Sequence, residues 1–310
     1  IYNFVGNKRF NINKITRTTS KDQVRKILNK CKVLYHFAGV NRPDKTKTFK
    51  KDNFELIKFF FDYLKKKKIK TQIIFSSSIQ VSKNNAYGNS KRKCEKLLLD
   101  LKKKNGNNVF ILRLPNIFGK WSRPNYNSVV ATFCHNIARN KKVNISSPYS
   151  IISLLYIDDL VVKLKEYTKI GLNKKIINRI KANYKITLQQ LYNKINDFQI
   201  NRTKKIIGKI SKGFNKKLYS TYISFLPKNK IIYNIEKKND PRGSFAEFYK
   251  NDDTGQVSFF IAKKGKIRGH HFHHSKVEKF LVVQGKAIFN MFDISTKKKL
   301  SFKLDDKTLK

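Results

Sequence analysis

Short apolar runs alternate with longer amphipathic stretches along the first two thirds of the chain. The short runs predict buried strands, and the longer stretches, with apolar positions every three or four residues, predict helices. The predicted strands are residues 11–15, 32–37, 71–75 and 108–112, and the predicted helices are residues 52–64, 86–101, 127–139 and 187–198. Strands that alternate with helices form βαβ units. We therefore expect an α/β domain with a parallel sheet that binds ligands at the carboxyl ends of its strands.

The pattern changes after Pro227, where turn sequences begin to separate short β-rich runs. Residues 256–262 and 279–283 are two such runs, and glycines such as Gly265 and Gly285 lie between them. A series of short strands divided by turns is typical of an all-β domain. The sequence therefore predicts two domains, residues 1–227 and residues 228–310.

The composition of the 310-residue chain agrees with two globular domains in a reducing compartment. It contains 24 Phe and 14 Tyr, enough for sizeable cores, and no apolar run approaches the roughly 20 residues that cross a membrane. Residues 1–10 have no signal-peptide pattern, so we expect a cytoplasmic protein with no membrane partner. Three widely spaced cysteines form no CxxC pair, which favours reduced thiols; they are Cys31, Cys94 and Cys134.

A formal net charge of +49 raises the question of a nucleic-acid partner. The lysines are spread over the whole chain among frequent Asn and Ile, and Lys far outnumbers Arg, whereas recognition of phosphates and bases favours Arg. A compositional bias explains this pattern, and we expect no specific nucleic-acid binding. A polyanion-binding protein on an enzyme-derived fold is the alternative, and a steep salt dependence without sequence preference would mark binding by charge alone.

Tyr87 and Lys91 are four residues apart at the start of a predicted helix, so their side chains share one helical face. A nearby cation favours the phenolate form and should bring the pKa of the phenol down from about 10 toward a useful range. Such a tyrosine can give a proton to a carbonyl oxygen while a hydride reaches the carbon. The three serines at residues 76–78, just past a predicted strand, supply a hydroxyl for the same site. The alternative is a surface tyrosine packed along a lysine stem.

The order of these motifs resembles the extended short-chain dehydrogenases/reductases, whose fold is Rossmann-like. The motifs are FSSS at residues 75–78, YxxxK at residues 87–91 and LRLPNIFG at residues 112–119. The resemblance implies that Ser78 orients the substrate carbonyl and that Tyr87 is the acid/base. It also implies that Lys91 activates the tyrosine and binds the nicotinamide ribose, and that Asn116 faces a sugar substrate.

The cofactor-binding segments match this family less completely. Residues 36–39 resemble the strand end that passes beside the cofactor, which implies that Ala38 and Gly39 bind it. Gly6 resembles the tail of the glycine-rich turn, and we expect part of that turn to be missing or deleted. Arg17 follows the predicted strand 11–15, where an Arg without an Asp or Glu favours a 2′-phosphate and therefore NADPH. Its alternative is an ordinary surface charge.

Residues 265–285 contain Gly265, His271, His273, Glu278 and Gly285 at the spacing G-x5-HxH-x4-E-x6-G. HxH on a strand puts both imidazoles on one face, and a carboxylate on the next strand can reach the same point. Two imidazoles and a carboxylate suit a divalent metal such as Zn²⁺. The spacing resembles the first motif of the cupin family and implies a metal site at His271, His273 and Glu278.

Other interpretations of this histidine-rich segment stay open. An exposed polar cluster is one of them, and a metal-free cupin is another. The segment from Arg268 to His271 also resembles sugar 3,5-epimerases, which implies that His271 is a proton-abstracting base. The second cupin motif is absent before Lys310, so we expect an incomplete barrel. Its open sheet edge invites pairing with another chain, which predicts a homodimer.

A reductase followed by a cupin resembles a family of capsular-polysaccharide enzymes, with further similar motifs at residues 36–43, 115–121, 123–134, 218–222 and 278–283. The resemblance implies C3 epimerisation of a UDP-2-acetamido-2,6-dideoxy-4-ketohexose by the cupin. NADPH-dependent C4 reduction to UDP-2-acetamido-2,6-dideoxy-L-talose would follow, on the route to UDP-N-acetyl-L-fucosamine. A polar cluster is the candidate contact for the UDP-sugar, with a helix N-cap as the alternative: Asn125, Tyr126, Asn127 and Ser128.

Two further functions compete with this interpretation. One is an NADP-dependent nucleotide-sugar 4-ketoreductase whose partial cupin serves only dimerisation. The other is a non-catalytic fragment, because most of the glycine-rich turn is missing.

Overall fold

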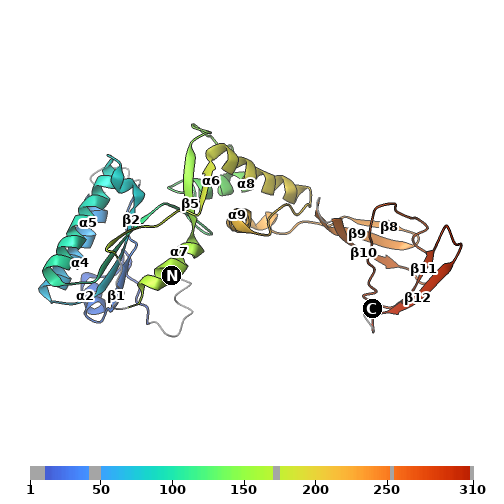
Figure 1. The fold of residues 1–310 in the computed structure, drawn as a ribbon, viewed down its shortest axis with the longest axis horizontal. Helices are drawn as coiled ribbons and strands as arrows, with labels where there is room; N and C mark the ends of the chain where they lie inside the picture. The colour runs from blue at the N-terminus through green and yellow to red at the C-terminus, as the bar shows by residue number, and fades with distance from the viewer. Residues whose placement is uncertain (1–10, 42–49, 170–174, 252–254, 308–310) are drawn as a thin grey trace. The chain divides into compact units, whose positions relative to one another are not determined.

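The computed structural model describes residues 11–41, 50–169, 175–251 and 255–307 (Figure 1). The chain forms two compact units. The first contains residues 1–237 and 246–259, and the second contains residues 238–245 and 260–310. Among the described residues, no helix combines the length and the apolar character needed to span a membrane.

The first unit is built on a parallel sheet in the order β1–β2–β3–β6. Its strands are β1 (Val33–His36), β2 (Gln72–Ser78), β3 (Val109–Leu114) and β6 (Ile177–Arg179). In the register, His36 pairs with Phe75 and Ser78 pairs with Leu114. The last residues of β2 and β3 therefore lie together at one edge of the sheet.

Alternate residues of the sheet face opposite layers of helices, as a period of two requires. Ile73, Phe75 and Ile111 pack in one cluster with buried residues of the helices on the first face, whereas Ile74, Phe110 and Leu112 pack with α7 on the other face (Figure 1). The helices of the first face are α2 (Lys21–Asn29), α4 (Leu56–Lys66) and α5 (Ala86–Asn105), and α7 is Ile157–Tyr167. This three-layer arrangement confirms the predicted α/β domain with a Rossmann-like parallel sheet.

Local capping sequences set the ends of these helices. Ser20 and Gln23 form a capping box at the start of α2, and the Asn85 side chain accepts a hydrogen bond from the N–H group of Gly88 at the start of α5. Gly106 ends α5 with φ of 70°, a left-handed conformation that favours glycine. The predicted helix 52–64 instead opens with a π-helical turn, η1 (Lys50–Glu55), before α4.

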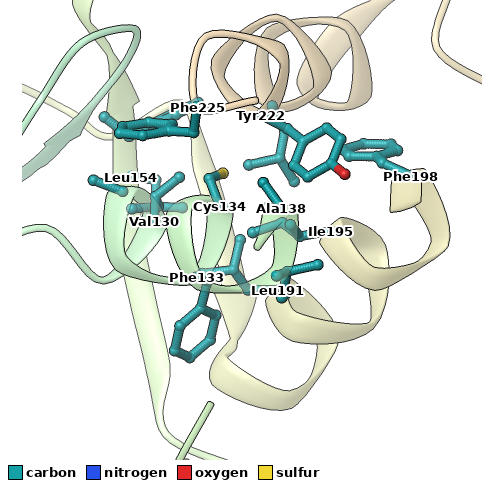
Figure 2. Packing of buried hydrophobic residues seen from close by; sticks show 14 of the residues in the cluster. Val130, Phe133, Cys134, Ala138, Leu154, Leu191, Ile195, Phe198, Tyr222 and Phe225 are labelled. Carbon is teal, nitrogen blue, oxygen red and sulfur yellow. The ribbon is translucent and has the colours of Figure 1, made fainter. Parts of the chain in front are cut away.

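A second sheet in the same unit has the order β4–β5–β7, with one parallel and one antiparallel pair. Its strands are β4 (Asn116–Phe118), β5 (Ile151–Tyr156) and β7 (Tyr184–Thr187). Three helices pack with it around a continuous apolar core: α6 (Val129–Ala138), α8 (Leu188–Thr203) and α9 (Gly213–Ile223). Figure 2 shows Cys134, Ile195 and Tyr222 meeting in this core.

The C-terminal part of the chain is all-β, as predicted. One sheet has the order β10–β9–β8, with β8 (Lys237–Asp240), β9 (Gly243–Asn251) and β10 (Gly255–Ala262). The other is an antiparallel pair, β11 (Lys286–Phe292) and β12 (Lys299–Asp305), in which Phe289 lies opposite Phe302. Two single-turn helices complete the described elements, η2 (Ile79–Ser82) and η3 (Lys228–Lys230).

Two predicted strands are wrong. Residues 11–15 and residues 279–283 carry no strand, and neither segment has a ladder partner among the described residues. An apolar run alone does not make a strand, because the backbone also needs a neighbour that completes its hydrogen bonds. The run 256–262 has such a neighbour and forms β10.

Candidate active site

Ser78 ends β2 and starts the single-turn helix η2. Its extended backbone and its hydroxyl cap that helix, because Ser78 Oγ accepts a hydrogen bond of 3.1 Å from the N–H group of Gln80. The turn brings the chain back so that α5 begins only a few residues later. The end of the strand and the start of the helix are therefore adjacent.

Tyr87 lies in the first turn of α5, and its hydroxyl is hydrogen-bonded to that of Ser78. Gly88 makes this approach possible. A Cβ atom at Gly88 would lie 2.2 Å from the carbonyl oxygen of Gln80 in η2, far inside van der Waals contact. The predicted pairing of the serine with the tyrosine is thus present in the structure.

The pKa of Tyr87 moves in the direction opposite to the sequence-based expectation. Burial raises this pKa above its ordinary value, and the hydrogen bond from Ser78 offsets the rise only in part. The expected lowering of this pKa by Lys91 is wrong, because the desolvation of the phenolate is the largest contribution and raises the pKa. Tyr87 is consequently a protonated phenol at neutral pH.

Lys91 lies one helical turn after Tyr87 and is almost completely buried, with 4% of its surface exposed. Its Nζ atom donates a hydrogen bond of 2.9 Å to the carbonyl oxygen of Ser76, lies 4.8 Å from the centre of the Phe75 ring and lies 5.9 Å from that of Tyr87. Burial lowers its pKa, while electrostatic interactions with Cys94 and Glu95 raise it. A buried ammonium group is thus held beside the tyrosine.

Gly39 lies beside this lysine, after the end of β1. A Cβ atom at Gly39 would lie 3.4 Å from Lys91 Nζ and 3.0 Å from Asn53 Oδ1. Ala38 and Gly39 are themselves exposed. The absence of a side chain keeps space open next to the ammonium group, which suits the close approach of a dinucleotide to the backbone.

Asn53 is a site residue that the sequence analysis missed. Its side chain accepts a hydrogen bond of 2.7 Å from the N–H group of Val40 and donates one of 2.9 Å to the Val40 carbonyl oxygen. It also donates to Ser90 Oγ on α5. Asn53 is buried on the apolar face of the predicted helix 52–64, with Ile57 one turn later. A polar residue at an apolar position of a helical pattern was the available signal.

His36, at the end of β1, is a second residue whose role was not predicted. It is 4% exposed, packs against the rings of Phe60 and Phe75, and has both ring nitrogens without a hydrogen-bond partner among the described residues. Burial, together with the charge of Lys91, lowers its pKa to about 4. His36 is therefore a neutral imidazole beside the buried ammonium group.

Arg17 is highly exposed, and its Nη2 atom lies 3.5 Å from Asp52 Oδ2. The predicted cation at the ribose position therefore has a carboxylate beside it, which the sequence analysis did not anticipate. Gly6, the other predicted cofactor residue of the N-terminal segment, lies outside the described residues.

The predicted sugar-binding residues follow β3 along the chain, from the start of β4 to the N-cap of α6. Asn116 is exposed two residues beyond Leu114, the register partner of Ser78, and its Nδ2 atom donates to the carbonyl oxygen of Ser153. Three more lie further along: Asn125, Asn127 and Ser128. Asn125 and Asn127 are exposed, whereas Ser128 is half-buried and caps α6 by accepting from the N–H group of Ala131.

The second unit brings together His271, His273 and Glu278. One potential ligand atom from each lies within 4.8 Å of the others, and His273 Nε2 is 3.6 Å from Glu278 Oε1. Lys276 Nζ is 3.2 Å from the same carboxylate oxygen. The expectation that HxH lies on a strand is wrong, because residues 271–273 have no ladder partner among the described residues. The two imidazoles therefore meet on a segment without a strand, with their ring centres 4.9 Å apart.

Comparison with known proteins places both parts of the chain. Residues 6–164 match the NAD dependent epimerase/dehydratase family, and residues 238–310 match the polysaccharide biosynthesis C-terminal domain. A UDP-2-acetamido-2,6-beta-L-arabino-hexul-4-ose reductase from Pseudomonas aeruginosa is 40% identical over 91% of this chain and 76% of its own length.

Solved structures agree with these matches. The capsular polysaccharide assembling protein CapF from Staphylococcus aureus aligns with a TM-score of 0.89 and 35% identity, over 100% of this chain and 84% of its own. The UDP-glucose 4-epimerase from Thermotoga maritima, at 17% identity and a TM-score of 0.54, covers 66% of this chain and 81% of its own. That second likeness concerns the fold alone.

Proposed function

The chain belongs to the NAD-dependent epimerase/dehydratase family, and from this premise we propose that residues 1–227 reduce the C4 ketone of a UDP-linked sugar with NADPH. The proposed substrate is a UDP-2-acetamido-2,6-dideoxy-4-ketohexose, and the UDP-2-acetamido-2,6-beta-L-arabino-hexul-4-ose in the name of the Pseudomonas relative supports this class. One observation carries the proposal: Ser78 and Tyr87 are hydrogen-bonded at the carboxyl edge of a parallel sheet, with Lys91 one turn away.

Each side chain has a separate part in this reduction. When bound, the nicotinamide would supply the hydride that reaches C4 of the sugar. Tyr87, protonated because its pKa is raised, gives its proton to the ketone oxygen, and the Ser78 hydroxyl donates a hydrogen bond that orients the carbonyl. Lys91 stabilises the phenolate that remains. Because Gly39 has no side chain, space remains beside Lys91, and the dinucleotide would bind there.

The test is turnover of the 4-keto sugar nucleotide, followed by the loss of NADPH absorbance. Tyr87→Phe should lower kcat at least about 100-fold, since it removes the proton donor, and Ser78→Ala should lower it less. Tyr63→Phe is the matched control, because the Tyr63 hydroxyl contacts Asn29 on the outside of the helical layer. Equal turnover by Tyr87→Phe and the wild type would refute the proposal.

We further propose that residues 228–310 form a cupin half-barrel that inverts C3 of the same sugar before reduction. The donor set of two imidazoles and a carboxylate supports a divalent metal such as Zn²⁺. Donor atoms that share one metal ion lie roughly 3.4 Å apart, so the exposed side chains would need to close by at most about 1.4 Å. Bound there, the metal would polarise the C4 ketone and make the proton on C3 acidic. His271, His273 and Glu278 would hold it.

Epimerisation and reduction in this order yield UDP-2-acetamido-2,6-dideoxy-L-talose, on the route to UDP-N-acetyl-L-fucosamine for capsule or O-antigen. The test is deuterium uptake at C3 in D₂O without NADPH, together with metal content measured by mass spectrometry. His271→Ala should lose both. His274 lies outside the cluster and packs edge-to-face with Phe272, so His274→Ala should keep both. Full deuterium uptake by metal-depleted His271→Ala would refute this second activity.

A further inference from the structure

Glu95 is a buried carboxylate on the same helix face as the residues of the reductase site. It follows Lys91 by one turn and Tyr87 by two turns of α5, and 4% of its surface is exposed. An ionised carboxylate at such a position is costly unless its partners replace water. Its contacts therefore define what it does.

The Glu95 carboxylate bridges the ends of two strands. Ser77 Oγ on β2 donates a hydrogen bond to Glu95 Oε1. Arg113 on β3 donates from Nε to the same oxygen at 3.1 Å and from Nη2 to Oε2 at 2.6 Å, a bidentate pair. Ser77 and Arg113 are direct register partners in the parallel ladder. One side chain of α5 is thus fastened to both strands at the same level of the sheet.

The Ser77–Arg113 pair of the ladder is adjacent to the reacting groups. Ser77 immediately precedes Ser78, and Arg113 immediately precedes Leu114, the register partner of Ser78. A displacement of α5 against β2 would change the separation between the Ser78 and Tyr87 hydroxyls. The hydrogen bonds of Glu95 to Ser77 and Arg113 resist that displacement.

The charge of Glu95 also acts on Lys91. Burial lowers the pKa of Lys91, and Cys94 and Glu95 are the neighbours that oppose this change. The pKa of the Cys94 thiol is raised to about 11 by burial, so this thiol is neutral near pH 7. The carboxylate of Glu95, which forms an ion pair with Arg113, then remains as the neighbour that raises the pKa of Lys91.

Resting on the proposed reduction, we propose that Glu95 is a positioning residue. It holds α5 against the carboxyl ends of β2 and β3, so that Tyr87 stays opposite Ser78. The residue reaches the reaction through these neighbours and touches neither substrate nor cofactor. A displacement of about 1 Å in a catalytic group can cost roughly 100-fold in rate.

The experiment compares Glu95→Gln with the double variant Glu95→Gln/Arg113→Met, which removes the unpaired cation, and with Glu95→Asp. Asp159→Asn is the matched control, because it breaks another partly buried ion pair, the one with Lys217. Each protein is assayed for reduction of the 4-keto sugar nucleotide by NADPH across pH, below its melting temperature. Glu95→Gln and the double variant should lower kcat roughly 10- to 100-fold with KM changed less than about threefold. The basic limb of their kcat profile should move to lower pH, as Lys91 loses its proton more easily.

Glu95→Asp should recover part of kcat, and Asp159→Asn should change melting temperature without moving the pH profile. The positioning role would be overturned if folded Glu95→Gln and the double variant both kept the wild-type kcat and the wild-type basic limb of the pH profile. Wild-type turnover in the same assay would still uphold the proposed reduction. Absence of turnover by the wild-type protein would overturn the proposed reduction itself, and this inference with it.

Discussion

Lys91 Nζ donates a hydrogen bond of 2.9 Å to the backbone carbonyl oxygen of Ser76, two residues before the serine that is bonded to Tyr87. The ammonium group is therefore fixed to the strand that carries Ser78, although the lysine itself belongs to α5. Its position over the Phe75 ring adds a cation–π contact at 4.8 Å. The site is assembled before any ligand binds, at the cost of a buried charge.

The desolvation of the buried Lys91 ammonium group leads to a prediction in which stability and activity change in opposite directions. Lys91→Met replaces a buried ammonium group by an apolar chain of similar length, so melting temperature should stay equal or rise. The reduction should lose at least about 100-fold in kcat, because the phenolate of Tyr87 is no longer stabilised. Lys93→Met, at an exposed position of the same helix, should leave kcat unchanged. Full activity of Lys91→Met would show that the lysine is only structural.

Arg17 and Asp52 lead to a prediction about cofactor choice. Their side chains lie 3.5 Å apart, so a 2′-phosphate at Arg17 would also meet a carboxylate. Arg17→Ala should weaken NADPH binding about tenfold or more and leave NADH binding almost unchanged, and Asp52→Asn should strengthen NADPH binding. Calorimetric titration of both cofactors measures this, with Arg25→Ala, an exposed ion-paired arginine, as the control. Equal losses for NADPH and NADH in Arg17→Ala would remove Arg17 from the specificity site.

His36 makes the stability of the first unit depend on pH. Its pKa of about 4 in the folded protein lies below about 6.5 in the unfolded chain, so the unfolded state binds a proton more readily between these values. Stability is therefore unaffected above about pH 6.5 and falls as the pH decreases toward 4, by roughly 2 kcal/mol at pH 5. The neighbouring charge is Lys91, and the packed rings are Phe60 and Phe75.

Urea unfolding at pH 7 and pH 5 tests this contribution. His36→Leu should remove about 2 kcal/mol of the difference between the two pH values. His135→Leu, at a half-buried position on α6, should leave the difference as it is in the wild type. A pH dependence of His36→Leu equal to that of the wild type would mean that other groups cause it.

The sequence predicted the sheet and the shared helical face of Tyr87 and Lys91 because both depend on local patterns, whereas the choice of Ser78 came from the resemblance of the motif order to a known family. The apolar runs of β1, β2 and β3 face helices on both sides, and the spacing of YxxxK fixes one helical face. The direction of the pKa change at Tyr87 was not predictable, because it depends on burial by distant parts of the chain. Asn53 and Glu95 were missed for a similar reason, since their partners lie on other elements.

The two wrongly predicted strands also show that a local pattern does not reveal contacts with other elements. Residues 279–283 have a suitable apolar run, but a strand also needs a neighbouring backbone, and no local pattern reveals whether one is present. The HxH spacing nevertheless placed His271 and His273 together, with ring centres 4.9 Å apart, without a strand. Residues so close in sequence can meet through several backbone conformations.

Gly88 gives the sharpest prediction about how the reductase site is held together. A Cβ atom there would lie 2.2 Å from the carbonyl oxygen of Gln80 and 2.9 Å from that of Lys83, both backbone atoms. Alanine is favoured over glycine in a helix by up to about 1 kcal/mol, but forcing two packed backbones apart costs about 1–3 kcal/mol. The cost of the clash should therefore exceed the gain in helix propensity. Gly88→Ala should destabilise the protein, and it should lower kcat by separating Tyr87 from Ser78.

Gly208→Ala is the matched control for Gly88→Ala. Its new Cβ atom would meet only the side-chain end of Asn201, at 2.5 Å from Nδ2, and a flexible side chain can move away. Urea unfolding and NADPH-dependent turnover should show a large loss for Gly88→Ala and changes within about 0.5 kcal/mol for Gly208→Ala. Equal behaviour of the two variants would mean that η2 and α5 can separate freely. The Ser78–Tyr87 hydrogen bond would then not depend on the packing of η2 against α5.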